Sequence, residues 1–381
     1  MRTQVAIVGG GPAGLMLGRL LELRGIESVI LEARDREYVQ QRVRAGVLEQ
    51  ATMDLMDEVG LGERMHAEGL VHEGVELRFA GESHRIALKE LTGRAITIYG
   101  QQEVVKDLIG ARLASGLPLY FEVSDVEVDV AGRVAFTHQD ERHVLEADVI
   151  AGCDGFHGVC RPAIADVLTV YEREYPFGWM GILAEAAPSS DELIYAHHER
   201  GFALASLRSP RITRMYLQCE PGEEPWEDEA IWDELDRRFG MAVNRGPIFE
   251  KGVTPMRSFV VEPMQHERLF LAGDAAHIVP PTGAKGLNTA MADVYLLAHA
   301  LEAFYQGDGS GLEAYSRVAL ERVWRVQHFS WWMTAMLHRF GSDDDFGLKL
   351  QLSQLRFTTT SVAQATALAE NYAGMPFRAT W

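Results

Sequence analysis

Cysteine is scarce in this sequence, and long apolar runs are missing from it. The three cysteines, Cys153, Cys160 and Cys219, form no plausible disulfide framework, and no Cys/His spacing matches a zinc site. We therefore expect no bound metal. No stretch of about 18 uncharged apolar residues predicts a transmembrane helix, and no signal-peptide pattern follows the first methionine. These absences favour a soluble protein of the reducing cytoplasm.

Basic residues are also in the minority. The chain has 55 Asp and Glu against 36 Lys and Arg, which gives a net charge of −19. A nucleic-acid-binding protein needs a basic surface, so we expect no nucleic-acid partner, and nothing favours an anionic membrane surface. A small anionic substrate is still compatible with this charge, because local arginines decide the charge of a pocket. The 381 residues, 47% of them apolar, predict a globular protein of two domains.

The N-terminal segment carries a nucleotide-binding fingerprint. Its predicted elements are a strand, a helix and a second strand, at 4–8, 12–24 and 28–31. After the first strand, Gly9, Gly11 and Gly14 satisfy Gly-x-Gly-x-x-Gly, which makes a tight turn and presents a helix N-terminus to a pyrophosphate. Glu32 follows the second strand and can accept both ribose hydroxyls. The pattern predicts a bound dinucleotide without deciding between FAD and NAD.

The rest of the chain predicts a discontinuous nucleotide domain with an inserted layer. Residues from about 170 to 265 have the short strands and turns of a mostly antiparallel sheet, and the acidic run 220–230 within them is expected to be a solvated loop or a helix start. Further strands are expected at 71–88, 96–99, 144–151 and 269–272, and helices at 102–114, 286–304, 311–339 and 362–370. The expected fold class is α/β, or α+β overall.

A second glycine-rich segment follows the strand at 269–272. Gly273 and Asp274 would place a carboxylate where a sugar-alcohol chain can be held. The run from Pro280 to Asn288 then delivers a helix N-terminus, whose positive end would stabilise a reduced, anionic flavin. The alternative is a glycine-rich loop that makes a tight domain junction.

A segment near the middle of the chain suits a ligand with two polar ends. If 195–216 is strand–turn–strand, Ser206, Arg208, Arg214 and Tyr216 share one face, because side chains alternate along a strand. A guanidinium, a hydroxyl and a phenol on one face suit a ligand with a carboxylate at one end and a hydroxyl at the other. The alternative is an ordinary half-buried hairpin with polar ends.

Two weaker signals lie in other loops. Arg42 and Arg44 could clamp a pyrophosphate from outside, although surface arginines are usually only solvated. Asp154 follows the predicted buried strand 144–151 and resembles another ribose or pyrophosphate contact, with His157 nearby. A single histidine in such a place is more often structural.

Several long segments together resemble the para-hydroxybenzoate hydroxylase (4-hydroxybenzoate 3-monooxygenase) family of single-component, FAD-dependent aromatic hydroxylases. The likeness covers nearly the whole chain and is carried by residues 42–50, 69–74, 152–158, 257–266, 273–288, 329–334 and 370–372. It implies an FAD-binding Rossmann-like domain, an inserted mostly antiparallel β-sheet substrate domain and a helical C-terminal region. The implied boundaries are 1–72, 97–170 and 266–300 for the first, 73–96 and 171–265 for the second, and 301–381 for the third.

The resemblance also implies roles for single residues. Substrate binding falls on Tyr195, Ser206, Leu207, Arg208, Tyr216 and Pro281. The catalytic set, which includes a proton network from the substrate phenol to solvent, is Tyr195, Tyr372, His72 and the carbonyl of Pro281. FAD contacts fall on Gly9, Gly11, Ala13, Gly14, Glu32, Arg42, Val43, Arg44, Ala45, Gly46, Val47, Gln101, Asp154, Arg214, Asp274, Leu287 and Asn288. NADPH contacts fall on Tyr38, His157 and Arg257.

Two positions depart from the family pattern. His197 stands where the best-known members carry asparagine, and 357–361 lacks the tyrosine of the equivalent region. Neither departure affects a residue with an implied chemical role.

The implied reaction uses NADPH, or NADH in second place, to reduce FAD, and dioxygen to form a flavin hydroperoxide that hydroxylates 4-hydroxybenzoate to 3,4-dihydroxybenzoate in aromatic catabolism. A phenolate reacts better than a phenol, whose pKa is near 10, so the site has to ease ionisation. Cations or donors for a 2′-phosphate are available at Arg34, Arg36, Tyr38 and Arg42, with Asp35 and Glu37 opposing them. The resemblance also implies a homodimer.

Two other readings are open, and two more are disfavoured. The first is the same chemistry on another ring acid, such as an aminobenzoate or a dihydroxybenzoate. Flavin-dependent disulfide reductases and halogenases are disfavoured, because no cysteine pair precedes Cys153 and no halogenase motif is found. The last is a non-enzymatic protein-binding module on an FAD fold, which would purify without yellow flavin absorbance.

Overall fold

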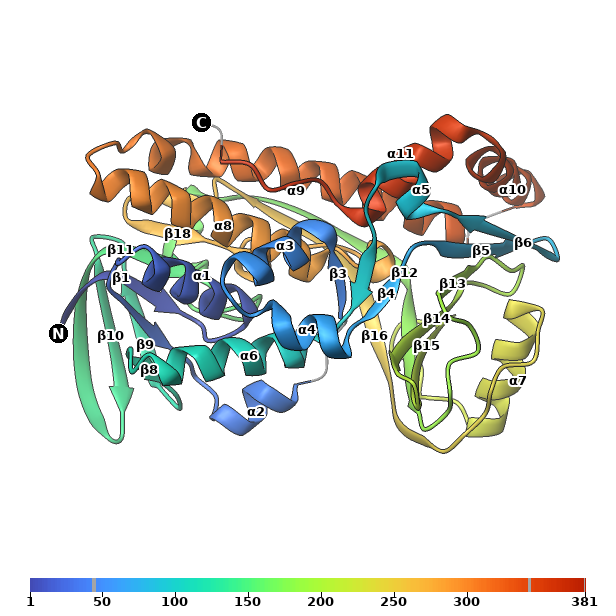
Figure 1. Cartoon of the computed structure of the whole chain (residues 1–381), viewed down its shortest axis with the longest axis horizontal. Coiled ribbons are helices and arrows are strands. Elements are labelled where there is room, and N and C mark those ends of the chain that lie inside the picture. The colour runs from blue at the N-terminus through green and yellow to red at the C-terminus, as the bar shows by residue number, and fades with distance from the viewer. Residues whose placement is uncertain (43–45, 342–343, 380) are drawn as a thin grey trace.

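The computed structural model describes residues 1–42, 46–341, 344–379 and 381. Within these ranges the strands form two sheets of eight strands and a small sheet of three. Figure 1 shows the first large sheet near the N-terminus, the second at the opposite end of the molecule, and the C-terminal helices running along one side of both. The mixed α/β class with a helical C-terminal region is as predicted.

The first sheet holds the N-terminal βαβ unit. β1 pairs in parallel with β2 and β11, and β11 pairs in parallel with β18. A parallel core of this kind is buried on both sides, which explains the run of apolar residues in β1. The strands are β1 (Arg2–Val8), β2 (Ser28–Leu31), β8 (Leu119–Tyr120), β9 (Ser124–Asp129), β10 (Arg133–His138), β11 (Glu141–Gly152), β17 (Gln265–His266) and β18 (Leu269–Leu271).

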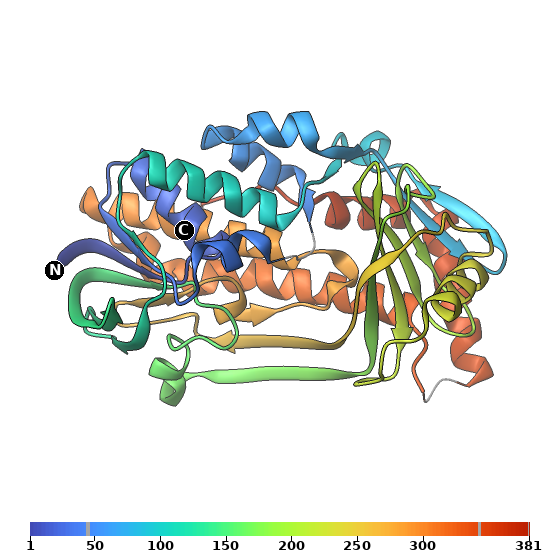
Figure 2. The same ribbon diagram turned by 90° about the horizontal axis from the view of Figure 1, so that it is seen from below.

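The second sheet is antiparallel except where β13 and β5 run parallel. Its longest strands, β12 and β16, extend from this sheet to the nucleotide-binding half, so one ribbon joins the two halves (Figure 2). The strands are β5 (Val75–Phe79), β6 (Glu82–Ile86), β12 (Thr169–Ala184), β13 (Leu193–Ala196), β14 (Ala203–Ser209), β15 (Ile212–Cys219), β16 (Ile248–Glu262) and β19 (His277–Ile278). The small sheet contains β3 (Val47–Glu49), β4 (Leu70–His72) and β7 (Ile96–Ile98).

Helices cover the sheets and fill the C-terminal third. α1 begins with proline at its first position, where no backbone donor is needed, and it packs between α6 and α8. The helices are α1 (Pro12–Leu23), α2 (Arg36–Gln41), α3 (Gln50–Glu58), α4 (Gly62–Glu68), α5 (Leu88–Thr92), α6 (Gln101–Ala114), α7 (Asp228–Phe239), α8 (Gly286–Tyr305), α9 (Ser310–Leu337), α10 (Asp345–Thr360) and α11 (Val362–Ala373). Short 3₁₀ turns lie at Pro162–Val167, Gly273–Ala275 and Pro281–Gly283.

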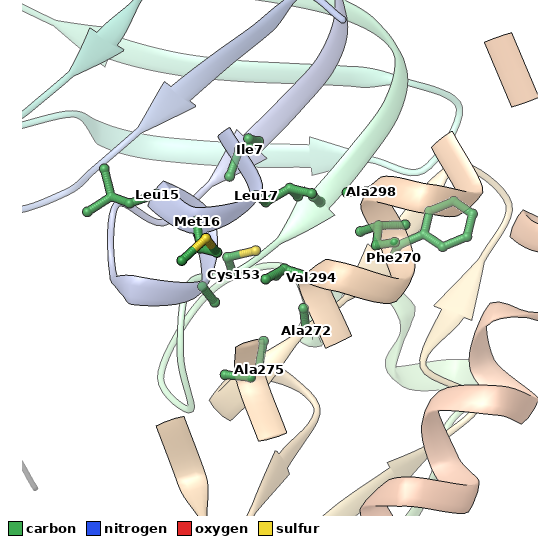
Figure 3. Close-up of a cluster of buried hydrophobic side chains, with 14 of the residues drawn as sticks. Ile7, Leu15, Met16, Leu17, Cys153, Phe270, Ala272, Ala275, Val294 and Ala298 are labelled. Carbon is green, nitrogen blue, oxygen red and sulfur yellow. The ribbon is translucent and has the colours of Figure 1, made fainter. Parts of the chain in front are cut away.

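Three apolar cores follow from this layering. The largest joins α1, α8 and the first sheet, where Met16, Cys153 and Val294 meet (Figure 3). The second lies between one face of the antiparallel sheet and the C-terminal helices, and the third lies between the opposite face and α7. The substrate-facing strands therefore have a different core on each side.

Several local elements differ from the predictions, and β9, β10, α3 and α4 are among those that were not predicted. The region 71–88 contains the end of β4 and then β5 and β6, with turns between them. Helix α10 was not predicted, because Phe346, Leu350 and Phe357 are exposed on it and blur the apolar periodicity that marks a buried face. The acidic run at 220–230 leads into α7 as expected. The domain boundaries stay a prediction.

Candidate flavin and substrate site

The glycine fingerprint forms a turn that larger residues could not make. Gly9 has φ +109°, and a side chain there would collide with the carbonyl of Cys153. A side chain on Gly14 would collide with the carbonyl of Gly9. These contacts bring the end of β1, the start of α1 and the end of β11 together, as a dinucleotide-binding turn requires.

The space beside this turn fits a dinucleotide. A Cβ added to Gly11 meets no atom within 4 Å, and Gly11 is the N-cap of α1, whose first N–H groups attract a pyrophosphate. Glu32 stands beside it, because its Oε2 accepts a hydrogen bond from Gly10 N at 2.7 Å and its Oε1 accepts one from Arg34 N at 2.8 Å. Ala13 is buried in the first turn of α1. The residues present therefore fit the dinucleotide part of FAD.

Asp154 closes its own loop at the end of β11. Its Oδ2 accepts a hydrogen bond from Cys160 N at 2.8 Å. Burial raises the pKa of Asp154 although that hydrogen bond opposes the shift. Its buried Oδ1 has no hydrogen-bond partner among the described residues, so one acceptor is available beside the fingerprint turn.

A buried carboxylate fixes the second glycine-rich turn. Asp293 of α8 accepts hydrogen bonds on Oδ2 from Gly273 N at 2.9 Å and pairs with His277 Nε2 at 2.7 Å. Asp274, the next residue, is left exposed, where a sugar-alcohol chain can reach it. Asp293 was missed in the sequence, although an acidic residue in the otherwise apolar run 286–304 was a signal.

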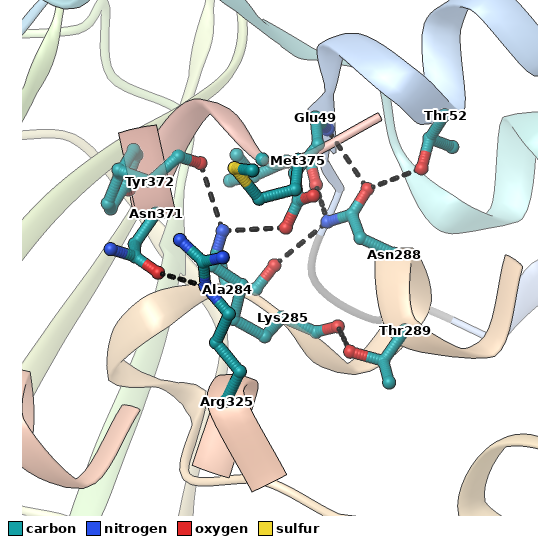
Figure 4. Close-up of polar contacts among 12 residues, drawn as sticks. Glu49, Thr52, Ala284, Lys285, Asn288, Thr289, Arg325, Asn371, Tyr372 and Met375 are labelled. Carbon is teal, nitrogen blue, oxygen red and sulfur yellow. Dashed lines mark hydrogen bonds and ion pairs between the residues drawn. The ribbon is translucent and has the colours of Figure 1, made fainter. Parts of the chain in front are cut away.

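The side-chain amide of Asn288 makes all of its hydrogen bonds within the protein. Its Oδ1 accepts from Glu49 N at 2.9 Å and Thr52 Oγ1 at 2.8 Å, and its Nδ2 donates to Val47 O at 2.9 Å and Ala284 O at 3.0 Å (Figure 4). The side chain thus ties the N-terminus of α8 to β3. Any contact of Asn288 with FAD has to use its backbone.

The other residues implied for FAD differ in how deeply they are buried. Leu287 is half-buried in the first turn of α8, and Gln101 is half-buried in the first turn of α6. Gly46 is buried, and a side chain on it would come within 2.9 Å of Arg208 Nη1. Arg42 is exposed at the end of α2. Val43, Arg44 and Ala45 lie outside the described residues.

The predicted strand–turn–strand is present as β14 and β15. Ser206 pairs with Arg214, and Leu204 pairs with both Tyr216 and Tyr195. Residues directly opposite each other share a face, so the hydroxyl, guanidinium and phenol predicted for one face do lie together. A register shift follows Leu207, which is buried.

This face gathers positive charge. Burial and the nearby Arg214 lower the pKa of Arg208 to about 10. The Nη1 of Arg214 is buried without a hydrogen-bond partner among the described residues, and its guanidinium lies 5.1 Å from the ring of Tyr216. Like charges held close in a buried site favour a bound anion.

Two tyrosines meet beyond the arginines. The hydroxyls of Tyr195 and Tyr372 lie 2.5 Å apart, and both side chains are buried. Burial raises the pKa of each phenol, so both are neutral near pH 7.

The third member of the implied proton network, His72, is buried, but among the described residues it makes no hydrogen bond to this pair. Neither of its ring nitrogens has a hydrogen-bond partner among the described residues. Burial lowers the pKa of His72 to about 4, against the opposing effect of Glu192 and Asp191. The structure joins the tyrosines and leaves His72 neutral and unconnected within the described part of the chain.

Comparison with known proteins identifies the family to which this chain belongs. The FAD binding domain family matches residues 2–330. The p-hydroxybenzoate hydroxylase of Acinetobacter baylyi is 47% identical over 99% of this chain and 96% of its own length. The chain belongs to the p-hydroxybenzoate hydroxylase family of FAD-binding proteins. It is a flavoprotein monooxygenase with FAD as its cofactor.

Solved structures share the fold of this hydroxylase. The p-nitrophenol 4-monooxygenase of Pseudomonas putida DLL-E4 has a TM-score of 0.82 at 17% identity, with 97% of this chain and 98% of that chain covered. The anhydrotetracycline hydroxylase of Streptomyces rimosus has a TM-score of 0.77 at 21% identity, with 98% and 76% covered. In the described part of the chain, every helix is too short or too polar to cross a membrane.

A buried ion pair in this hydroxylase contacts the backbone of Tyr372. Lys285 Nζ donates to Glu49 Oε1 at 2.6 Å and to the carbonyl of Tyr372 at 3.0 Å (Figure 4). Gly374 has φ +87°, and a side chain there would collide with Glu49. Sequence reasoning missed Glu49 and Lys285, because no motif marks an ion pair between distant residues. Pro281 is exposed at the start of the 3₁₀ turn that precedes Lys285.

The residues implied for the nicotinamide nucleotide fall into two groups. His157 and Arg257 both contact Phe156, with ring centroids 5.0 Å apart for the histidine and the guanidinium 5.1 Å from the ring. Tyr38 lies on α2 instead, with Arg34 at 5.3 Å and Arg42 at 6.0 Å from its ring. The structure brings the first two together and leaves Tyr38 between the arginines that flank α2.

Proposed function

We propose that this flavoprotein hydroxylates 4-hydroxybenzoate to 3,4-dihydroxybenzoate with a nicotinamide nucleotide and dioxygen. One observation carries the proposal. The face of β14 and β15 holds half-buried Arg208 and Arg214 beside Ser206, while the Tyr195–Tyr372 hydroxyl pair lies further along the same side. A carboxylate and a phenol at opposite ends of one ring complement these two groups. The name of the Acinetobacter relative supports the same substrate.

In this proposal the carboxylate end is bound by charge and hydrogen bonding. Arg208 supplies a fork of donors that matches a carboxylate, and Ser206 supplies a hydroxyl on the same face. Arg214 adds a second positive charge and a buried donor, Nη1. Tyr216 lies beside Arg214 and limits the width of the pocket.

The phenol end is expected to lose its proton through the tyrosines. The substrate hydroxyl donates to Tyr195 Oη, and Tyr195 passes a proton to Tyr372 Oη at 2.5 Å. The last step, from Tyr372 to His72 and solvent, crosses a gap that no direct hydrogen bond spans among the described residues. Neutral tyrosines and a neutral His72 suit this role, because no fixed negative charge then stands beside the reacting ring. The Pro281 carbonyl, which accepts a hydrogen bond from Ala284 N at 2.9 Å within its own turn, is assigned to the same ring by the family resemblance.

FAD, when bound, supplies the reduction by nicotinamide nucleotide and the activation of dioxygen. In this protein Gly9, Gly11 and Gly14 would hold its pyrophosphate, Glu32 a ribose, and Asp274 the sugar-alcohol chain. The N-terminus of α8, which begins at Gly286, would stabilise negative charge on the bound cofactor. Burial of Tyr195 and Tyr372 keeps water from this end of the pocket.

We also infer a cytoplasmic homodimer that prefers NADPH and serves aromatic catabolism. Exposed Phe346, Leu350 and Phe357 on α10 offer apolar area for a second copy. Light scattering of the purified protein tests the dimer. Limited proteolysis, read by mass spectrometry, tests the boundaries near 170, 265 and 300.

The deciding experiment measures NADPH oxidation with and without 4-hydroxybenzoate and identifies the aromatic product. We expect a yellow protein, strong stimulation by the substrate, and 3,4-dihydroxybenzoate in yield equal to the NADPH consumed. Parallel assays with 4-aminobenzoate and 3,4-dihydroxybenzoate test the alternative ring acids. Peroxide as the only product from every acid would overturn the assignment.

A further inference from the structure

An aromatic stack lies next to the substrate face, between the end of α9 and β12. The ring of His338 stacks on Phe177, with centroids 4.7 Å apart and planes at 10°, and on Phe202, at 4.3 Å and 27°. Trp179 continues the stack against Phe202 at 5.1 Å. All four side chains are buried. A histidine at the centre of such a stack calls for a reason beyond packing, because phenylalanine would fill the same space.

The reason is a hydrogen bond that only one form of the imidazole can make. Trp179 Nε1 donates to His338 Nε2 at 2.7 Å, and His338 Nδ1 lies 3.0 Å from the carbonyl of Thr334. An indole nitrogen can only donate, so Nε2 is the acceptor and Nδ1 carries the hydrogen. Burial lowers the pKa of His338 to about 3, although the bond to Thr334 opposes the shift. The ring is therefore neutral near pH 7.

Both tyrosines of the substrate face touch this stack. The ring of Trp179 lies 4.9 Å from that of Tyr216, and Phe202 lies 6.1 Å from Tyr195. Stacking has little directional preference, whereas the hydrogen bond from Nε1 to His338 restrains rotation of the indole about χ1 and χ2. The edge of Trp179 that meets Tyr216 is thereby fixed as well.

We propose that His338 is a positioning residue for the substrate pocket, acting through the Trp179 indole on the ring of Tyr216. This inference rests on the proposed function, because Tyr216 lines the pocket only if the ring acid binds there. His338 sets how much width the pocket offers beside Arg214. Loss of the hydrogen bond weakens binding of the ring acid and relaxes the choice among para substituents.

The test is a double-variant cycle on substrate affinity. His338→Phe keeps the ring but removes the acceptor, and Trp179→Phe removes the donor; each should raise the Kd of 4-hydroxybenzoate about tenfold, because one buried polar group loses its partner. The double variant His338→Phe with Trp179→Phe has no buried donor left unpaired and should be less impaired than the product of the single effects. His338→Gln supplies another acceptor and should restore part of the affinity.

Further readouts separate positioning from general destabilisation. FAD content and the rate at saturating substrate should change little, while KM rises and the ratio of rates on 4-hydroxybenzoate and 4-aminobenzoate falls. Wild-type Kd in both single variants, or strictly additive effects in the double variant, would overturn the inference. Wild-type turnover is measured first: failure with 4-hydroxybenzoate refutes the proposed function, and the cycle is then run with the ring acid that the wild type does hydroxylate.

Discussion

Two groups of buried charge lie on opposite faces of the same antiparallel sheet, and they are built differently. On the α7 face, Glu234 accepts from Arg200 and Arg238 at 2.9 Å each, and from Arg237 at 2.5 Å. On the other face, Arg208 and Arg214 lie close enough that the second lowers the pKa of the first. One group contains opposite charges and the other brings like charges together.

The difference separates structural charge from charge kept for a ligand. Burial would raise the pKa of Glu234, but hydrogen bonds from Arg200 and Arg238 outweigh it and lower the pKa to about 2, so the folded protein stabilises its own anion. Arg208 is destabilised as a cation by burial and by Arg214. A fold that holds two guanidiniums together in this way is stabilised when an anion binds between them.

The strongest test of this contrast removes Arg208. Arg208→Ala should raise the Kd of 4-hydroxybenzoate by roughly two to four decades, because truncating one partner of a buried charge pair costs about 2–5 kcal/mol. FAD content should stay normal, and the thermal midpoint of the ligand-free protein should not fall. Fluorescence titration measures the Kd. Arg208→Lys, which keeps the charge but not the fork, should lie in between; an unchanged Kd in the alanine variant would show that another cation binds the carboxylate.

The matched variant on the other face is Glu234→Gln. It leaves Arg238 buried beside a neutral partner, so unfolding in urea should show a loss of about 3 kcal/mol, with the substrate Kd unchanged.

The pH dependence has a definite sign. The folded pKa of Glu234 is about 2, below its ordinary value of 4.5, so its contribution is present above pH 4.5 and is lost as the pH falls towards 2. The Glu234→Gln variant should therefore lose less stability between pH 4.5 and 2 than the wild type does. If stability depends on pH in the same way in both proteins, Glu234 makes no such contribution.

Tyr372→Phe addresses the uncharged end of the pocket. The hydroxyl that faces Tyr195 at 2.5 Å is removed, while the arginine face is untouched. The Kd should therefore change little, and the hydroxylation rate should fall by up to about a hundredfold, with more peroxide released. Stopped-flow absorbance and product yield across pH measure this. Rate and coupling equal to wild type at every pH would remove Tyr372 from the proton path.

Sequence reasoning found the parts of the site that local geometry determines. The turn at Gly9–Gly14 and the shared face of Ser206 and Arg214 both depend on residues that are close in the chain. The local sequence pattern is therefore enough to predict their geometry. It also predicted the helix start after Gly286, because proline and glycine limit what the backbone can do there.

The parts that were missed depend on contacts between distant segments. Lys285 meets Glu49 across the interior, and Trp179 meets His338 across the second core. No spacing rule links such residues, and each has an ordinary role in its own segment. The four hydrogen bonds of the Asn288 side chain are a similar case, since only the folded structure shows that the protein uses them all.

A third group of arginines tests the same distinction at the surface, where effects are smaller. At the two ends of α2, Arg34 and Arg42 flank the ring of Tyr38, while Asp35 is occupied as the helix N-cap by accepting from Tyr38 N at 2.8 Å. These exposed guanidiniums lie around one ring, and a 2′-phosphate could form ion pairs with both of them. We therefore expect kcat/KM to be higher with NADPH than with NADH.

The margin should be about tenfold or less, because an exposed ion pair contributes only about 1 kcal/mol in water. The double variant Arg34→Ala with Tyr38→Ala should remove most of the preference by lowering kcat/KM for NADPH alone. Arg36→Ala is the control, since it deletes one neighbouring positive charge that is not among the cations over the Tyr38 ring, and it should change the ratio less. The ratio should also shrink with added salt, which screens exposed charges. If wild-type protein used NADH equally well, these cations would be solvated surface charge with no part in choosing the nucleotide.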